Sequence, residues 1–190
     1  MEIIPTLFKE VLMIKPKLHI DHRGSFSEKF NRQDFIKHIG YQIDFCQDNI
    51  THSKRGVLRG LHYQFHPHAQ SKLVSVIKGT VLDIIVDIRK GSPTFGKHFS
   101  KELSENNHLN IFIPRGFAHG FITLSKKSIF QYKVDQYYHP ESEITIAPND
   151  PELGINWILP ESEWLQSDKD KKQLMLKETI LFDYNKDLNE

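Results

Sequence analysis

Three histidines within seven positions are the side chains in this sequence that most directly suggest chemistry. They are His62, His66 and His68, in the stretch RGLHYQFHPHAQSK that spans residues 59–72. Histidine is the commonest metal ligand, and its imidazole gains or loses a proton near neutral pH. The stretch therefore indicates a metal site or an acid–base site, with three unrelated side chains on a strand and a turn as the structural alternative.

Proton transfer needs a base, an acid on the opposite side of the reacting carbon, and a group that stabilises the developing negative charge. His62 is a candidate base, Tyr132 a candidate acid and Lys72 a candidate cation for the oxyanion. Taken singly, such residues more often pack on a strand or face water. Side chains that could bind an anionic, hydroxyl-rich ligand are Arg23, Glu28, Gln47, Asn49, Arg59 and His119.

The candidate residues lie among short apolar runs that are typical of β-strands. Runs rich in Val, Ile and Phe cover residues 73–77, 81–88, 109–113, 119–124 and 128–134. Turn-forming residues separate these runs, and Lys78-Gly79-Thr80 predicts a hairpin turn. Regular short strands of this kind favour a β-sandwich or barrel over an alternation of strands and helices.

Two segments have helical patterns. Residues 31–39 begin at Asn31, a suitable N-cap, and are followed by Gly40, a common helix stop. The charged segment from about residue 168 to 179 is the second. The chain has no repeat, low-complexity tract or linker, so we expect one β-rich domain over residues 1–190, with a C-terminal extension over residues 160–190.

Strand periodicity raises two questions about side-chain direction. Strict alternation places Arg59 and His62 on opposite faces of a strand, so a shared site requires a bulge at Gly60. In the run 81–88, Asp83 and Asp87 fall on the same face as apolar neighbours. That face is the solvent face, which alternation alone slightly favours, or else the wall of a polar cavity.

Composition excludes several classes of protein. A net charge of +1 over 190 residues gives no basic field for a nucleic-acid partner. Cys46 is the only cysteine, which excludes an intramolecular disulfide and a thiolate metal cage. Charged residues interrupt the N-terminal apolar stretch, which predicts neither a signal peptide nor a membrane span. The cytoplasm is the expected location.

Two spacings in this chain resemble the motifs of the cupins, a family of small double-sheet β-barrels. Gly60, His66-Pro67-His68, position 72 and Gly79 follow the first motif, and residues 114–119 (PRGFAH) follow the second. Where a metal-binding cupin has a glutamate, this chain has Lys72, whose ammonium group has no lone pair and repels a divalent cation. The resemblance therefore predicts a cupin cavity without a metal, and His66 and His68 as loop residues.

Longer motifs are similar to those of the dTDP-4-dehydrorhamnose 3,5-epimerase family, whose members are metal-free cupins. The resemblance implies a mainly β fold, a cupin-type double-sheet barrel or jelly roll with short helices, and an epimerase that needs no cofactor. The motifs extend from about residue 21 to 170: DHRGSFSE (21–28), FCQDN (45–49), RGLHYQ (59–64), QSKLV (70–74), VDIRKGSPTFG (86–96), IPRGFAHGF (113–121), YKVDQYYHPESE (132–143), NDPELGINW (149–157) and SDKD (167–170).

The resemblance assigns roles to individual residues. It implies that His62 is the general base with Asp170 as its carboxylate partner, Tyr132 the general acid, and Lys72 the group that stabilises the enolate. It also implies a homodimer in which the N-terminal segments, residues 1–20, cross to the partner. Tyr138 would stack on the base of the nucleotide sugar, and the residues expected to bind this substrate are Arg23, Phe26, Glu28, Gln47, Asp48, Asn49, Arg59, Lys72, His119, Tyr138, Glu143 and Lys169.

The implied reaction inverts C3 and C5 of a dTDP-4-keto-6-deoxy-hexose, on the way to dTDP-rhamnose. The presence of Tyr132 favours inversion at both carbons. Pro148 stands where family members usually have a tryptophan, which leaves another nucleoside-diphosphate 4-keto sugar, or inversion at C3 alone, as alternatives. Alternatives of other classes are a non-catalytic sugar-binding barrel and a metal-dependent cupin isomerase or dioxygenase that uses His62, His66, His68 or His119.

Overall fold

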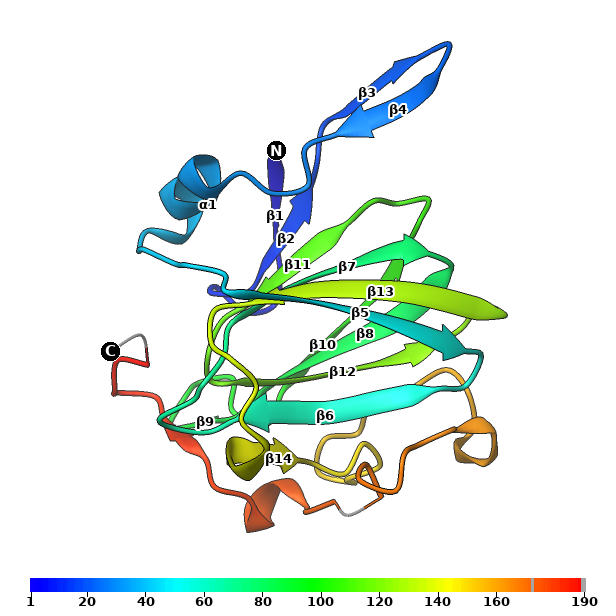
Figure 1. Cartoon of the computed structure of the whole chain (residues 1–190). Helices are drawn as coiled ribbons and strands as arrows, with labels where there is room; N and C mark the ends of the chain where they lie inside the picture. The colour runs from blue at the N-terminus through cyan, green and yellow to red at the C-terminus, as the bar shows by residue number, and fades with distance from the viewer. Residues whose placement is uncertain (172, 189–190) are drawn as a thin grey trace.

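The computed structural model describes residues 1–171 and 173–188 and shows a mainly β fold (Figure 1). Each of the five apolar runs forms a strand. They are β7 (Lys72–Lys78), β8 (Thr80–Asp87), β11 (Asn110–Ile113), β12 (Phe117–Thr123) and β13 (Lys127–Val134). Among the described residues, no helix is long and apolar enough to span a membrane.

Two antiparallel sheets face each other and hold the apolar core between them (Figure 1). The six-stranded sheet has the order β1-β2-β11-β7-β13-β5, and the five-stranded sheet has the order β10-β8-β12-β6-β14. Their remaining strands are β1 (Glu2–Pro5), β2 (Leu12–Lys15), β5 (Gln47–Lys54), β6 (Leu58–Gln64), β10 (His98–Ser104) and β14 (Glu143–Thr145).

Short elements complete the chain. A hairpin of β3 (Leu18–Asp21) and β4 (Gly24–Ser27) projects from the body, and β9 (Arg89–Lys90) pairs in parallel with β15 (Phe182–Asp183). The 3-10 helices are η1 (Pro140–Ser142), η2 (Glu161–Glu163) and η3 (Leu176–Glu178).

Helix α1 (Arg32–Ile39) packs against part of the outer face of the six-stranded sheet and forms as its sequence predicts. The Asn31 side chain accepts a hydrogen bond from the backbone N–H of Asp34, and Gly40 ends the helix in the left-handed conformation. Phe35 is buried against Phe112 of β11, with ring centroids 5.0 Å apart. The helix therefore covers the part of this outer face that carries Ile14, Leu73 and Phe112.

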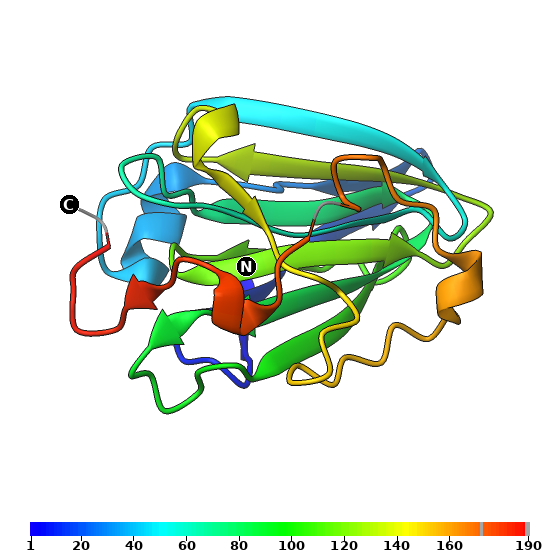
Figure 2. The same ribbon diagram turned by 90° about the horizontal axis from the view of Figure 1, so that it is seen from below.

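The C-terminal segment covers the outer face of the five-stranded sheet, where it packs as an extended chain (Figure 2). The expected helix over residues 168–179 is wrong: among its described residues, only the short η3 is helical. Leu174 bonds instead to the backbone of Thr145 and Ala147, at 3.1 and 2.9 Å. Backbone groups that pair with a neighbouring strand cannot also form the bonds of a helix. The buried apolar side chains of this segment include Leu153, Trp157, Leu159, Leu176 and Phe182.

The expected hairpin turn at Lys78-Gly79-Thr80 is also wrong, because β7 and β8 belong to different sheets. The turn passes the chain from one sheet to the other. Gly79 has φ of +79°, and a Cβ there would clash with the carbonyl oxygen of Lys127. The glycine is needed for a corner between sheets, and short-range turn signals do not distinguish a corner from a hairpin.

Asp83 and Asp87 on β8 are fully buried, so the solvent-face interpretation of this strand is wrong. The carboxylate of Asp83 binds His119, and that of Asp87 binds Arg89, Ser92 and Thr94. Both faces of the five-stranded sheet are covered, so alternation along β8 separates two interior environments. Polar partners make the burial of these carboxylates possible.

A bulge at Gly60 places Arg59 and His62 in the same cavity, as a shared site requires. On β12, His119 pairs with His62 and Phe121 pairs with Arg59, so Gly60 and Leu61 together oppose the single residue Gly120. Gly60 has φ of +120°, and a Cβ at this position would lie 2.6 Å from Cα of Gly120. Only glycine fits this conformation and this approach of two backbones.

We predict that Gly60→Ala lowers the free energy of unfolding by at least about 3 kcal/mol, from backbone strain together with overpacking. Chemical denaturation measures this change. Gly154→Ala is the matched control, since Gly154 has φ of +56° with open space around it. The control variant should lower the free energy of unfolding by about 1–2 kcal/mol, from backbone strain alone. Equal losses in the two variants would contradict the close packing described for the bulge.

Candidate active site

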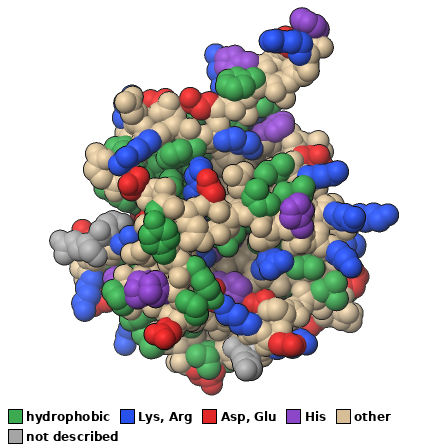
Figure 3. Space-filling model, viewed as in Figure 1, with side chains coloured by type: hydrophobic (Ala, Val, Ile, Leu, Met, Phe, Trp, Pro, Cys, Tyr) green, Lys and Arg blue, Asp and Glu red, His purple; other side chains and the backbone are tan. Residues whose placement is uncertain are grey.

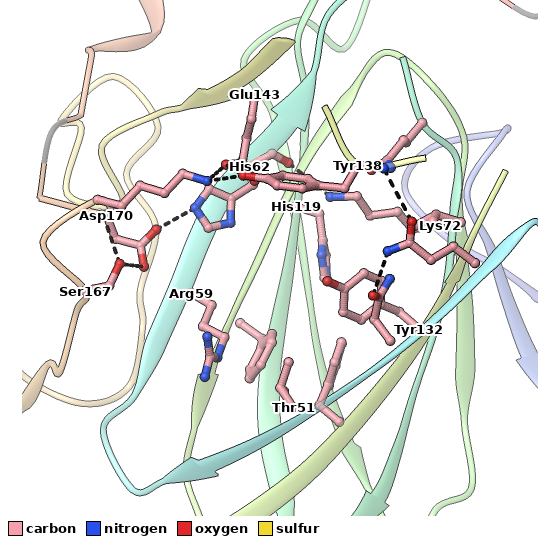
Figure 4. Close-up of a pocket in the computed structure, with 17 residues that line it drawn as sticks. Thr51, Arg59, His62, Lys72, His119, Tyr132, Tyr138, Glu143, Ser167 and Asp170 are labelled. Atoms are coloured by element: carbon pink, nitrogen blue, oxygen red, sulfur yellow. Dashed lines mark hydrogen bonds and ion pairs between the residues drawn. The ribbon is translucent and has the colours of Figure 1, made fainter. Parts of the chain in front are cut away.

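A cavity of about 390 Å³ lies between the two sheets and collects most of the residues that the sequence nominated (Figure 4). Strands β5, β6, β7, β12, β13 and β14 contribute its walls, and three segments between strands, residues 65–71, 135–142 and 166–171, contribute the rest. The nominated residues that line it are Gln47, Asn49, Arg59, His62, Lys72, His119, Tyr132, Tyr138, Glu143, Lys169 and Asp170.

His62 on β6 forms a close pair with Asp170. The imidazole Nε2 lies 2.5 Å from Oδ1 of Asp170, whose side chain is only 7% exposed. Burial lowers the pKa of His62, and Asp170 opposes this shift. Burial opposes ionisation of Asp170 as well, but hydrogen bonds from His62 and Ser167 outweigh it and lower the pKa of the carboxyl group. Because Asp170 holds Nε2, Nδ1 is the ring nitrogen left to accept a proton.

Lys72 begins β7 and brings a cation to the same cavity. Its Nζ lies 3.5 Å from the carbonyl oxygen of His62. Burial lowers the pKa of Lys72 to about 8, against the attraction of Asp83. The ammonium group is thus positioned to stabilise negative charge that develops near His62.

His119 on β12 forms a second imidazole–carboxylate pair, with Asp83 of β8. Nε2 of His119 lies 2.7 Å from Oδ2 of Asp83, and both side chains are buried. Burial raises the pKa of Asp83, while His119 and Lys72 oppose the shift. Asp83 does not line the cavity itself, but it orients a residue that does.

Tyr132 on β13 lies on the wall opposite His62, since β13 and β6 belong to different sheets (Figure 4). Burial raises the pKa of its phenol, so the group stays protonated near neutral pH. The rings of Phe121 and Phe130 stack beside it with centroids 4.1 Å apart and form an apolar part of the wall. A base and an acid therefore face one cavity from two sides.

Three nominated residues meet across the loops of the cavity. Nζ of Lys169 donates to the hydroxyl of Tyr138 at 2.7 Å and pairs with the carboxylate of Glu143. Gln47 accepts from the backbone of Tyr138 at 3.4 Å and donates to Asn49 at 2.9 Å. These contacts join both loops to β5 and leave polar groups for an anionic ligand.

Arg23, Phe26 and Glu28 lie outside this cavity. Arg23 and Phe26 are on the projecting hairpin β3–β4, and Phe26 is 69% exposed. Figure 3 shows the hairpin standing clear of the body of the molecule. The nomination of Asp48 does not fit the strand geometry, because period two on β5 turns its side chain away from Gln47 and Asn49. Its carboxylate binds Lys133 at 2.8 Å instead.

The three histidines of the opening motif do not form one site. The ring of His66 contacts Phe65 and Phe182, and that of His68 stacks on His139 with centroids 3.4 Å apart. Neither lines the cavity that His62 and His119 share. Within residues 1–171 and 173–188, no group of three or more His, Cys, Asp or Glu side chains could hold a metal ion.

Sequence reasoning missed several residues of the site: Thr51, Gln70, Phe121, Ser167 and, behind the wall, Asp83. The two-residue period of side chains along a strand could have identified Thr51 and Phe121, which lie two residues from Asn49 and His119 on the same strands. Ser167 and Gln70 lie on loops, where periodicity carries no information. Pro148 does not line the cavity; its carbonyl oxygen accepts a hydrogen bond from Trp157 in the layer beneath the five-stranded sheet.

The arrangement can carry out proton transfer at a carbon atom. A buried imidazole backed by a carboxylate faces a protonated phenol, and a cation lies beside them for an oxyanion.

Comparisons with known proteins agree with this chemistry. The family model for dTDP-4-dehydrorhamnose 3,5-epimerase matches residues 5–178. A Salmonella typhimurium protein named dTDP-4-dehydrorhamnose 3,5-epimerase is 45% identical over 95% of this chain and 98% of its own. A dTDP-6-deoxy-D-glucose-3,5-epimerase of Legionella pneumophila, solved with dTDP-4-keto-L-rhamnose, superposes with a TM-score of 0.93 at 45% identity, covering 97% and 99% of the two chains.

A dTDP-4-dehydrorhamnose 3,5-epimerase of Elizabethkingia anophelis gives a TM-score of 0.89 at 45% identity, over 93% of this chain and 96% of its own. The matches cover nearly the whole chain, including the loop that carries Asp170. The chain therefore belongs to the dTDP-4-dehydrorhamnose 3,5-epimerase family.

Proposed function

We propose that this isomerase inverts C3 and C5 of a dTDP-4-keto-6-deoxy-hexose, converting dTDP-4-dehydro-6-deoxy-glucose to dTDP-4-dehydrorhamnose, through an enolate. The observation that carries the mechanism is the placement of His62 with Asp170 across one cavity from Tyr132, with Lys72 beside them. Membership in an epimerase family supports the reaction class.

The 4-keto group supplies the reactivity. Removal of a proton from C3 or C5 gives an enolate, whose charge resides largely on the C4 oxygen. Nδ1 of His62 takes the proton from one face, and the Tyr132 hydroxyl donates a proton to the other face, which inverts the centre. Asp170 stabilises the imidazolium and keeps Nε2 protonated, which is the role of a carboxylate in hydrolytic triads.

Lys72 stabilises the enolate oxygen. His119, held by Asp83, lies on the strand next to His62 and offers a polar contact to the same sugar. Charge stabilisation is strong here because the groups are oriented before the reaction and shielded from water. The protein's own side chains supply the base, the acid and the cation of this scheme.

The nucleotide part of the substrate occupies the rest of the cavity and its loops. Arg59 and Lys169 provide cations for the diphosphate, with Gln47 and Asn49 as hydrogen-bonding neighbours. Tyr138 stacks on the nucleobase of the substrate, and Glu143 binds the substrate beside it. Binding must exchange the contacts of Lys169 with Tyr138 and Glu143 for contacts with the ligand.

The two facing sheets belong, we propose, to a cupin-type jelly roll that works as a homodimer. The hairpin β3–β4 exposes Ile20 at 75% and Phe26 at 69%, more apolar surface than a projecting element usually leaves in water. In the dimer, the N-terminal segment crosses to the partner, so that Arg23, Phe26 and Glu28 complete the partner's substrate site. The single domain spans residues 1–190 and ends in the C-terminal extension.

Solvent exchange tests the proposed reaction. The wild-type protein, incubated with dTDP-4-keto-6-deoxy-glucose in deuterated water, should incorporate deuterium at C3 and C5, as measured by NMR. His62→Ala should abolish incorporation, because the base is lost. Full exchange in this variant would refute the assignment of the base, and binding of the nucleotide sugar without any wild-type exchange would indicate a sugar-binding protein instead.

Tyr132→Phe should separate exchange from inversion. His62 still removes a proton, but only solvent or His62 itself can return deuterium, and return by His62 occurs on the original face. Deuterium should therefore enter the substrate while the yield of epimerised sugar falls by about 10²-fold. NMR of the recovered sugar distinguishes the two outcomes. Unchanged epimerisation would exclude Tyr132 as the acid.

The rate should depend on pH through a base that must be neutral and a cation that must be charged. His62 loses its proton as pH rises, and burial lowers its pKa from the ordinary 6.5. The acidic limb of the pH–rate profile should therefore lie below pH 6.5. Lys72 loses its charge as pH rises through about 8, so the rate falls again there.

Lys72→Arg serves as the matched control for the basic limb. Arginine keeps its charge at these pH values, so the limb near pH 8 should disappear, even if altered geometry lowers the plateau. Lys72→Met should lower kcat by about 10²–10³-fold at all pH values. A basic limb near pH 8 that persists in Lys72→Arg would show that another group titrates.

A further inference from the structure

Ser167 contacts the one member of the proposed catalytic set that is not held by a sheet. Oδ1 of Asp170 faces Nε2 of His62 at 2.5 Å, and Oδ2 accepts a hydrogen bond from Oγ of Ser167 at 2.7 Å (Figure 4). The backbone N–H of Asp170 donates to the same Oγ at 3.1 Å. The serine therefore closes a small ring with Asp170.

This ring fixes the direction of the serine hydroxyl. Since Oγ accepts from the N–H of Asp170, its own proton points to Oδ2. The Asp170 side chain is 7% exposed, so Oδ2 has little access to water as an alternative donor. A buried carboxylate oxygen left unpaired is costly, and a carboxylate bonded through one oxygen only is free to rotate.

The loop around Asp170 is held by individual contacts and not by a sheet: Lys169 pairs with Glu143, the N–H of Lys171 donates to the carbonyl oxygen of Ser167 at 3.1 Å, and the Gln173 side chain donates to the carbonyl oxygen of Asp170. Its ends are anchored by single bridges, from Leu165 to Val57 beside β6 and from Leu174 to Ile146 beyond β14. Between these anchors, residues 166–171 and 173 have no regular secondary structure. By contrast, His119 and Asp83 lie on adjacent strands β12 and β8, where the sheet itself sets their geometry.

We propose that Ser167 is a positioning residue that orients the Asp170 carboxylate toward Nε2 of His62, and thereby keeps Nδ1 directed to the substrate. The proposal rests on the proposed function of His62 as the base. Ser167 acts through Asp170 and forms no bond in the reaction. Its direct contact with substrate is the competing explanation, because Ser167 also lines the cavity.

The charged groups around the His62–Asp170 pair influence the pKa that a titration of His62 measures. Lys72 and Lys169 lower the proton affinity of His62, and Asp170 raises it. If the Asp170 carboxylate is less well held, its attraction for the His62 proton weakens, while the repulsion from Lys72 and Lys169 is unchanged. The midpoint of His62 titration should therefore fall when Ser167 loses its hydroxyl.

The experiment places Ser167→Ala and Ser167→Thr in the full-length protein, each with Asp170 intact and with Asp170→Ala. Ser167→Ala should lower kcat about tenfold with unchanged KM, a typical effect of losing a hydrogen bond to a charged group. Ser167→Thr should restore the rate, since it keeps the hydroxyl. In the Asp170→Ala background, Ser167→Ala should change kcat less than twofold, because the carboxylate that it positions is gone.

NMR titration of His62 provides a second readout that does not depend on turnover. The midpoint should fall by roughly half a pH unit in Ser167→Ala, recover in Ser167→Thr, and be insensitive to Ser167 when Asp170 is alanine. If the wild-type protein lacks exchange activity, the proposed function fails, and this titration still decides the role of Ser167.

Asp168→Asn is the control for damage to the loop. The Asp168 side chain is 98% exposed, on the residue next to Ser167, so the variant should leave both kcat and the His62 midpoint unchanged. An unchanged midpoint in Ser167→Ala, an equal loss of kcat in both Asp170 backgrounds, or a rise in KM alone would each overturn the proposal. The last result would assign Ser167 to direct substrate contact.

Discussion

The cost of burying charge is the constraint on which the rest of this structure depends. The interior between the sheets holds two imidazole–carboxylate pairs and an ammonium group, at Lys72, with little access to water. Each charge would be expensive alone, and each carboxylate is accordingly bonded to a histidine. Lys72 interacts with one member of each pair, since Asp83 favours its charge and its own charge disfavours protonation of His62. The same burial lowers the pKa of Lys72 to about 8, near neutrality, and lowers the pKa of His62 below its ordinary 6.5, so that the imidazole is neutral and free to accept a proton at neutral pH.

The sheets that hold these groups are themselves packed against outer layers. Helix α1 covers part of the outer face of the six-stranded sheet, and the C-terminal segment covers that of the five-stranded sheet with Trp157, Leu176 and Phe182. The strands that carry His62 and His119 are therefore packed on both faces. Fixed strands explain why the bulge at Gly60 can be tolerated: the neighbouring Gly120 leaves room for it, and the surrounding sheet holds the register on either side. Architecture and site geometry thus depend on the same packing.

The sequence predicted what local patterns determine. The five strands β7, β8, β11, β12 and β13 followed from apolar runs and the turn residues between them, and α1 followed from Asn31 and Gly40. The turn at Gly79, the segment 168–179 and the environment of Asp83 depended on which surface each element meets, which no short window contains. Within the site, strand residues could be nominated by their chemistry, whereas Asp170 came from family resemblance alone. Ser167 stands in the motif SDKD, but nothing in the sequence indicated its role, because the role of a loop residue depends on the partner that it reaches. The hairpin residues Arg23 and Phe26 lie outside the cavity of their own chain, so their assignment rests on the proposed dimer.

The two histidine–aspartate pairs differ in how they are built, and the difference separates their roles. His119 and Asp83 are paired across two central strands, so they form wherever the five-stranded sheet forms. His62 lies on the same sheet, but its partner comes from a loop whose ends pair with the chain through Leu165 and Leu174, beside β6 and β14. Lys169, on the same loop, reaches Tyr138 and Glu143 across the cavity. Docking of one segment therefore brings both Asp170 to His62 and Lys169 to Tyr138 and Glu143. In the proposed mechanism, the oxyanion is then stabilised from the rigid sheet, and the base is completed by the same loop that binds the nucleotide.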